Sequence, residues 1–339
     1  MSKKNLSVNL KSVFKNYKDL SNVFLNFKNK LDHLNKKNYL VAVSGGADSL
    51  ALVALTKAYK SYKKTKFYYV LVDHKIRKNS NQEAQQVKIL LKKNNIDLKI
   101  LKNKKKISRN IQAEARKVRY DILQDFCKLN KVKIILTAHN LEDQVETFFI
   151  RLSRGSGLKG LSSMKAITKI SRQVSLFRPL LDTKKQNLIK ISKNIFGKYF
   201  KDPSNNNTKY LRTKVRSLKK PLEKSGIKYD QIFKSIQNLS LSKITLDVYL
   251  NNIFKDLIKK VNQEIFINFE KYKALSNDIK IELINESVKK LKKNYYTIRS
   301  KKIENLIENL NKKEFKKSTL GGCIFFRKGE NLCLKVEKV

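Results

Sequence analysis

The sequence predicts an α/β protein, with a doubly wound parallel sheet and a second, smaller, mainly helical C-terminal domain that ends in a β-hairpin. Short apolar runs alternate with helical patterns through the first half of the chain, as strands joined by crossover helices do. Polar clusters follow three of these runs, where parallel sheets bind ligands. The tail carries two apolar stretches, 320–327 and 332–336, on either side of a Lys-Gly-Glu-Asn turn.

The first domain is expected to contain four short strands and the helices that connect them. The strands are predicted at 39–43, 67–72, 98–101 and 132–136. The helices are predicted within 1–37 and at 47–62, 81–93, 111–129, 141–152 and 184–200. Asp202-Pro-Ser-Asn205 indicates a turn, and further helices are expected over 219–260 and 288–310. Because the α/β alternation stops near residue 217, we expect domains at 1–217 and 218–339.

The composition favours a polyanionic partner. The 339 residues include 76 basic and 28 acidic side chains, which gives a net charge of +48 and a pI of about 10.1. Such a surface attracts nucleic acid, and the attraction weakens as salt is added. Drift toward A- and T-rich codons is an alternative origin for the charge, because most of the basic residues are Lys, and Asn and Ile are also abundant.

Cysteine usage and hydropathy indicate the cellular compartment. Cys127, Cys323 and Cys333 form no C-x-x-C pair, which argues against a structural zinc site or a disulfide framework. No run of about eighteen apolar residues predicts a membrane span. The first residues are polar and basic and lack an apolar signal core. We therefore expect a cytoplasmic protein.

The hexapeptide Ser-Gly-Gly-Ala-Asp-Ser at 44–49 joins a buried strand to a helix, a context typical of a phosphate-binding loop. Gly45 and Gly46 allow positive φ angles and close approach of the backbone to a phosphate, and the N–H groups at the helix start form an anion cradle. Ser44 and Ser49 add hydroxyl groups. Asp48 would repel phosphate unless Mg²⁺ bridges the two. The simpler alternative is a glycine turn followed by an acid favoured by the helix dipole.

Two of the three histidines, His74 and His139, follow predicted strands and have acidic neighbours. His139 precedes a helix on which Asp143 and Glu146 share one face, because they are three residues apart. The two carboxylates and the imidazole are therefore candidates to hold Mg²⁺, to bind a cationic substrate or to accept a proton. The alternative is an ordinary acidic helix N-terminus, which stabilises a helix only slightly.

The loop at 44–49 resembles the pyrophosphate-loop (PP-loop) motif of the N-type ATP pyrophosphatases. The order of the other motifs over residues 39–216 resembles the tRNA(Ile)-lysidine synthase family, and the C-terminal tail is more weakly similar. The motifs that carry this resemblance are Val72-Asp-His74 with Arg77, Gln112-Ala-Glu-Ala-Arg116 with Arg119-Tyr120, Ala138-His139 with Asp143-Gln-Val-Glu-Thr147, Arg154-Gly-Ser-Gly-Leu-Lys-Gly-Leu161, Arg178-Pro-Leu-Leu181, Asp202-Pro-Ser-Asn205, and Tyr210 with Arg212 and Arg216.

The resemblance implies the PP-loop ATPase fold and an ATP-dependent ligase. Its substrates would be free L-lysine and an isoleucine tRNA with a CAU anticodon, with no protein partner required. Lysine would be joined to C2 of the wobble cytidine through an adenylylated tRNA intermediate, with release of pyrophosphate and AMP. The expected cofactors are ATP and Mg²⁺. We further expect the domain after residue 217 to grip the tRNA body, because runs of Lys there lie outside the motifs.

The site residues that follow from the motifs and the resemblance fall into four groups. The catalytic candidates are Asp48, His139, Asp143, Glu146 and Arg212. The ATP-binding candidates are Ser44, Gly45, Gly46, Ala47, Asp48, Ser49, His74 and Arg116. Arg212 and Arg216 are expected to contact tRNA, and Asp48 is expected to hold the metal.

The chain departs from the family pattern at two positions, where Glu142 stands in place of Asp and Thr213 in place of Asn. These departures put the equivalence of those two residues in doubt. Two other functions stay open: a PP-loop enzyme that transfers sulfur to tRNA, and a non-catalytic RNA-binding protein with the same fold. The first needs a reactive Cys or a cluster-binding C-x-x-C, and the second would not release pyrophosphate.

Overall fold

The computed structural model describes residues 14, 17–75, 79–103, 111–201, 210–292, 298–312 and 314–337. The chain divides after Ser240 into two compact units, here called unit 1 (residues 1–240) and unit 2 (residues 241–339). Arg77 and Asp202-Pro-Ser-Asn205, which contribute to the family resemblance, lie outside the described residues, as does the side chain of Gln112.

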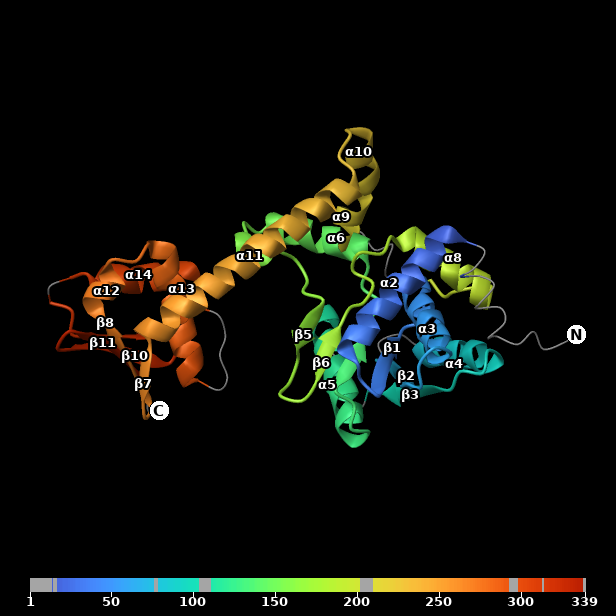
Figure 1. Cartoon of the computed structure of the whole chain (residues 1–339), viewed down its shortest axis with the longest axis horizontal. Helices are drawn as coiled ribbons and strands as arrows, with labels where there is room; N and C mark the ends of the chain where they lie inside the picture. Colours follow the sequence, from blue (N-terminus) through green and yellow to red (C-terminus); the bar gives the residue numbers. More distant parts are fainter. Residues whose placement is uncertain are drawn as a thin grey trace, which may run out of the picture. The chain divides into compact units, whose positions relative to one another are not determined.

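Unit 1 is built on a six-stranded sheet with the order β3-β2-β1-β4-β6-β5 (Figure 1). The first five of these strands run parallel, and β5 pairs antiparallel with β6 at one edge. The strands are β1 (Asn38–Val43), β2 (Lys66–Asp73), β3 (Leu98–Lys102), β4 (Ile134–Leu136), β5 (Ile167–Lys169) and β6 (Ser175–Phe177). This arrangement confirms the predicted doubly wound parallel sheet.

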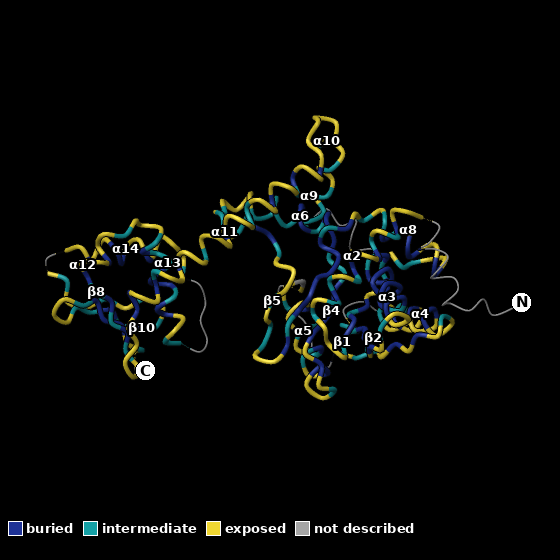
Figure 2. Tube along the Cα trace, viewed as in Figure 1, coloured by how far each residue is buried: buried dark blue, intermediate teal, exposed yellow. Residues whose placement is uncertain are grey.

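Helices cover both faces of the sheet, because successive side chains of its central strands point to opposite faces and are buried on both (Figure 2). Val41 and Val43 of β1 pack in one core with α2, α3, α4 and α8, whereas Leu40 packs on the opposite face with Leu123 and Cys127 of α5. The helix bounds are α2 (Lys18–Leu34), α3 (Ala47–Lys60), α4 (Ser80–Lys93), α5 (Ile111–Leu129) and α8 (Lys185–Phe196).

The predicted strands and helices of the first domain are confirmed, with bounds shifted by a few residues. The edge pair β5 and β6 is the main addition. Each of these strands has only three residues, and a run of that length carries too little alternation to be recognised. The N-terminal amphipathic segment is found as α2, which buries Leu20, Phe24 and Phe27.

Unit 1 extends beyond the residue 217 boundary expected from the sequence. After α7 (Leu158–Leu161), the helices α9 (Leu211–Ser217) and α10 (Lys219–Lys224) and the first part of α11 (Tyr229–Leu257) follow. Tyr229, Ile232 and Ile236 of α11 pack on Leu141 and Val145 of α6 (Leu141–Leu152). This small core explains why the compact unit continues to Ser240, although the strand–helix alternation has ended.

Unit 2 contains a five-stranded antiparallel sheet with the order β7-β8-β11-β10-β9. The predicted tail hairpin is present as β10 and β11, paired through Phe325 and Leu334. The sheet is larger than expected because three short strands add to the hairpin, and the helices of the unit pack on it around a separate core. The bounds are β7 (Lys259–Val261), β8 (Glu264–Asn268), α12 (Phe269–Lys273), α13 (Asn277–Leu291), α14 (Ser300–Leu310), β9 (Lys317–Leu320), β10 (Cys323–Lys328) and β11 (Asn331–Val336).

Gly45, directly after β1, is the glycine whose conformation the fold requires most strictly. Its φ is +84°, in the region that favours glycine, and a Cβ there would lie 2.5 Å from Cγ2 of Val87 in α4. The Gly45 carbonyl also accepts a hydrogen bond from the backbone N–H of Phe200 (3.0 Å). By contrast, Gly46 has an ordinary φ of −71°, so only one of the two glycines uses positive φ.

We expect Gly45→Ala to destabilise the protein by about 2–5 kcal/mol, because left-handed strain of about 1–2 kcal/mol adds to an overpacking cost of about 1–3 kcal/mol. Chemical denaturation of the purified variant measures this difference. Gly155→Ala is the matched control, since Gly155 also has a positive φ (+65°) but no heavy atom within 4 Å of the added Cβ. Equal losses in the two variants would contradict the clash with Val87, and a Val87→Ala background should relieve it.

Candidate active site

A cavity of about 250 Å³ opens at the carboxyl ends of the parallel strands of unit 1. In the sheet, β2 and β3 lie on one side of β1, and β4 lies on its other side. The strand order therefore reverses between β1 and β4, and parallel sheets bind ligands at such a switch point. Residues that follow β1 and β4 meet here with side chains of α5, α6 and α9. The lining residues are Ala42, Val43, Ser44, Asp48, Ser49, Val70, Val72, Arg116, Arg119, Tyr120, Leu123, Thr137, Ala138, His139, Asp143 and Arg212.

The loop between β1 and α3 forms one wall of the cavity. The Ser49 hydroxyl accepts hydrogen bonds from the Ser44 backbone N–H and hydroxyl, each at 3.2 Å, and donates to the Gly46 carbonyl at 3.0 Å. These bonds fix the loop in a tight turn. Gly46 is the N-cap of α3 and provides no side-chain cap, so the helix N-terminus is available to an anion.

Asp48, in the first turn of α3, is a carboxylate held in an unfavourable environment. Its Oδ1 atom is buried without a hydrogen-bond partner. The pKa of Asp48 is raised to about 6: burial is the largest cause, Asp143 and Glu142 add to it, and Lys185 and a hydrogen bond to Asn140 oppose the shift. An unpartnered carboxylate oxygen with a second carboxylate nearby fits a divalent cation.

The described residues contain no cluster of three or more His, Cys, Asp or Glu side chains arranged to hold a metal. Asp48 would therefore have to share a metal with the ligand. This fits Mg²⁺, which is commonly held by one or two carboxylates together with substrate phosphates.

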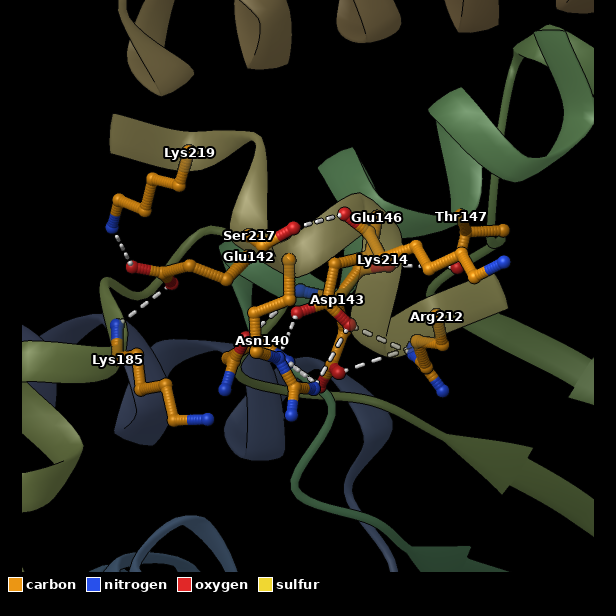
Figure 3. A network of polar contacts seen from close by, with 11 residues as sticks. Asn140, Glu142, Asp143, Glu146, Thr147, Lys185, Arg212, Lys214, Ser217 and Lys219 are labelled. Atoms are coloured by element: carbon orange, nitrogen blue, oxygen red, sulfur yellow. Dashed lines mark hydrogen bonds and ion pairs between the residues drawn. The ribbon is translucent and has the colours of Figure 1, made fainter. Parts of the chain in front are cut away.

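The start of α6 places Asp143 in the cavity through a capping box (Figure 3). The Asp143 N–H donates to Oδ1 of Asn140 at 3.0 Å, and the Asn140 N–H donates to Oδ2 of Asp143 at 3.1 Å. The expected helix start at Leu141 is confirmed. Glu142 faces away from the cavity: it accepts a hydrogen bond from the Lys185 N–H at the start of α8 (2.9 Å) and contacts Lys219 (3.3 Å).

One turn further along α6, Glu146 is buried between two arginines of α9. Its side chain is 3% exposed, and it accepts from Nε of Arg212 at 2.8 Å and from Nε of Arg216 at 2.7 Å. Arg212 also donates to Oδ1 of Asp143 at 3.2 Å. These contacts, most of them visible in Figure 3, attach α9 to α6 and hold Arg212 at the cavity.

His139, between β4 and α6, is held neutral. Burial and four nearby arginines, Arg178 foremost, lower the pKa of His139 to about 3. Its Nδ1 lies 2.9 Å from the Thr137 hydroxyl. A neutral imidazole in this position can donate or accept a hydrogen bond, but it retains a proton poorly at neutral pH.

Most of the predicted site residues meet in this cavity. Ser44, Asp48, Ser49, Arg116, His139, Asp143 and Arg212 all line it, and Gly45, Gly46 and Ala47 form the loop behind it. Glu146 and Arg216 do not line the cavity. Glu146 pairs with Arg212 and with Arg216, and these pairs hold α9 against α6. His74 is not among the lining residues; burial and Arg119 lower its pKa, and its Nδ1 is buried without a partner.

The sequence reasoning gave no role to Arg119, Tyr120 or Thr137, which also line the cavity. The signal for Arg119 was available, because it follows Arg116 by three residues on a predicted helix and so shares its face.

Comparison with known proteins agrees with the class that the fold and loop define. The family model of the PP-loop domain matches residues 17–222. The solved structure of the U34-tRNA thiolase NcsA from Methanococcus maripaludis matches with a TM-score of 0.55 and 19% identity, over 66% of this chain and 80% of that one. This likeness supports the fold alone. Sheet, loop and cavity thus define a PP-loop ATP-binding protein.

Curated relatives identify the family within that class. The tRNA(Ile)-lysidine synthase of Wolbachia pipientis wMel is 32% identical over 321 residues, which cover 93% of this chain and 74% of the relative. That of Orientia tsutsugamushi is 38% identical over 208 residues, 59% of this chain but only 46% of the relative. The chain belongs to the tRNA(Ile)-lysidine synthases, a family of ATP-dependent ligases.

We expect Glu146→Gln to lower the free energy of unfolding by about 1–3 kcal/mol, because it removes the charge that two guanidinium groups share. The loss should stay below the 3–5 kcal/mol typical of breaking a fully buried pair, since both arginines can regain water. Thermal and chemical unfolding measure it. Asp125→Asn is the control: Asp125 pairs with Lys128 at the surface and should cost less than about 1 kcal/mol. A Glu146→Gln loss as small as the control would contradict the role of this pair.

Proposed function

We propose that this protein ligates lysine to C2 of the wobble cytidine of an isoleucine tRNA with a CAU anticodon, through an adenylylated tRNA. The supporting observation is one cavity at the sheet switch point that brings together the phosphate-binding loop, a neutral histidine and two carboxylates. Family membership supports ATP use and tRNA modification. Lysine, the adenylylated intermediate and the anticodon are the parts that this proposal adds.

In the first step, the C2 oxygen of the cytosine attacks the α-phosphate of ATP, and pyrophosphate leaves. Loop N–H groups and the N-terminus of α3 would bind the phosphates, and Ser44 would contribute its hydroxyl. When bound, Mg²⁺ would neutralise charge on the departing pyrophosphate, with Asp48 as its protein ligand. Arg116 would contact the nucleotide from the opposite wall of the cavity.

In the second step, the lysine ε-amine displaces AMP from C2. Free lysine is protonated at neutral pH, with a pKa of about 10.4, so the site must bind an ammonium group and remove a proton. Asp143 is the best placed of the candidates, because it lines the cavity and its Oδ1 already accepts from a cation, Arg212. His139 would orient the reacting groups in its neutral form, and Glu146 would position Arg212.

The two other functions left open by the sequence receive less support. Sulfur transfer requires a reactive thiol, but the three cysteines are buried and none lines the cavity. Burial raises the pKa of Cys127 to about 12, which keeps it a thiol. A purely RNA-binding role gives no reason for the buried, unpartnered carboxylate of Asp48 beside a phosphate-binding loop.

We propose that both units contribute to holding the tRNA. Residues 241–339 contain 22 basic and 12 acidic side chains, so this segment supplies only +10 of the net charge of +48. Most of the electrostatic attraction therefore comes from unit 1, which also contains the cavity. Arg212 and Arg216 are the candidate contacts closest to the site. Cytoplasmic localisation stays a prediction; among the described helices, none is long and apolar enough to cross a membrane.

Incubation of the protein with ATP, labelled lysine and total tRNA tests the proposal directly. We expect lysine to be incorporated into tRNA as lysidine, with one AMP and one pyrophosphate per lysine, and the yield to fall steeply with added salt. Nucleoside analysis after digestion identifies the product. Asp48→Asn should fold normally and lose activity. Pyrophosphate release without lysine incorporation, or sulfur incorporation instead, would reject the reaction.

The raised pKa of Asp48 predicts a pH-dependent magnesium affinity. The folded protein holds this proton more tightly than the unfolded chain, so Asp48 destabilises the fold above about pH 6, and this penalty disappears as the pH falls toward 4. Metal binding needs the ionised form. We therefore expect the affinity for magnesium–ATP, measured by calorimetry, to weaken as the pH falls through about 6. The Asp48→Asn variant should lack this dependence; if it titrates like the unaltered protein, another group is responsible.

A further inference from the structure

The cavity contains two guanidinium groups that have no counter-ion among the described residues. Arg116 and Arg119 lie one turn apart on α5 and both line the cavity. Neither forms an ion pair with any residue that the structure describes, whereas Arg212 and Arg216 share Glu146. The Nε atom of Arg119 is buried and has no hydrogen-bond acceptor. A buried cationic donor without an acceptor is costly unless a ligand supplies one.

The surroundings of Arg119 disfavour its charged form. Burial lowers its pKa, and Arg116 lowers it further. Arg178, whose Nη1 donates to the Lys165 carbonyl (2.7 Å) and the Thr168 hydroxyl (2.9 Å), adds positive charge near His139, as Arg116 and Arg119 do. Burial is the largest cause of the low pKa of His139, and these arginines lower that pKa further. This wall of the cavity is therefore strongly cationic and requires an anion.

The opposite wall is acidic. Asp48 lies at the start of α3, which packs on the opposite face of the sheet from α5, and its pKa is raised by burial and then by Asp143 and Glu142. The cavity of about 250 Å³ therefore has negative side chains on one wall and positive side chains on the other. The acidic wall suits the metal and the lysine ammonium, and the cationic wall suits a phosphate group without a metal.

We propose that Arg119, together with Arg116, binds the phosphate that stays attached to adenosine after pyrophosphate has left. The inference rests on the proposed function, in which pyrophosphate and its metal occupy the loop and Asp48. The remaining phosphate is then the only anion of the nucleotide inside the cavity. Arg119 would bind this phosphate for as long as the adenylylated intermediate exists. When AMP departs, Arg119 would again be without a partner.

A phosphate of the tRNA backbone is the other source of the same chemistry. The cavity favours the nucleotide, because the Nε of Arg119 is buried and a volume of about 250 Å³ suits a single nucleotide rather than a stretch of strand. The two sources are separated by measuring nucleotide binding in the absence of RNA.

The test compares AMP with adenosine as probes of the full-length protein, by equilibrium titration without tRNA. We expect Arg119→Gln to weaken AMP binding about 10- to 100-fold, which corresponds to the loss of one hydrogen bond to a charged group. Adenosine binding should not change, because adenosine has no phosphate. Arg119→Lys should recover part of the AMP affinity. Arg172→Gln, which removes an exposed guanidinium outside the cavity, should behave as the unaltered protein.

Three results would overturn the assignment: an unaltered protein that binds AMP no better than adenosine, a Gln variant that loses both ligands equally, or one that keeps AMP but loses tRNA affinity. The second would assign Arg119 to shaping the pocket, and the third would assign it to the RNA backbone. Failure of lysine incorporation together with the expected AMP result would reject the proposed function and leave Arg119 as a nucleotide-phosphate ligand.

Discussion

The parallel pairing of β1 with β4 is the constraint on which the site depends. Leu40 and Val41 of β1 lie opposite Ile135 and Leu136 of β4, so the carboxyl ends of the two strands open at the same edge. The phosphate-binding loop and the segment around His139 follow these ends, although about ninety residues separate them in the chain. A slip by one residue would turn the buried side chains of β4 to the opposite face and displace His139 from the loop.

Much of the fold could be predicted from the sequence because its elements carry strong local signals. The strands of unit 1 are apolar runs bounded by polar turns, and α5 and α6 show helical spacing over many residues. The five-stranded sheet of unit 2 was missed beyond its hairpin, since β7 and β9 have only three and four residues, and the five-residue β8, whose side chains do alternate in burial, closely follows the segment predicted as helix over 219–260. The division after Ser240 was also missed, because it depends on a small tertiary core between α6 and α11.

The sequence predicted which residues belong to the candidate site better than it predicted the contacts between them. The motifs indicated Asp143 and Glu146 as two equivalent carboxylates on one helix face. In the folded chain they differ: Asp143 lines the cavity, and Glu146 is buried against two arginines from a helix some seventy residues later. Local spacing cannot supply that partner. The same holds for Arg119, because spacing on a helix cannot show that its Nε has no hydrogen-bond acceptor among the described residues.

Because all three thiols are buried, their reactivity reports the local unfolding of the core in which each lies. Cys127 lies in the core between the sheet and α5, and Cys323 and Cys333 lie in unit 2. Burial raises the pKa of each of them, so the reactive thiolate is scarce in the native state. Alkylation can then proceed only through excursions that expose a core. Mass spectrometry of labelled peptides would separate the opening of one unit from that of the other, without any engineered label.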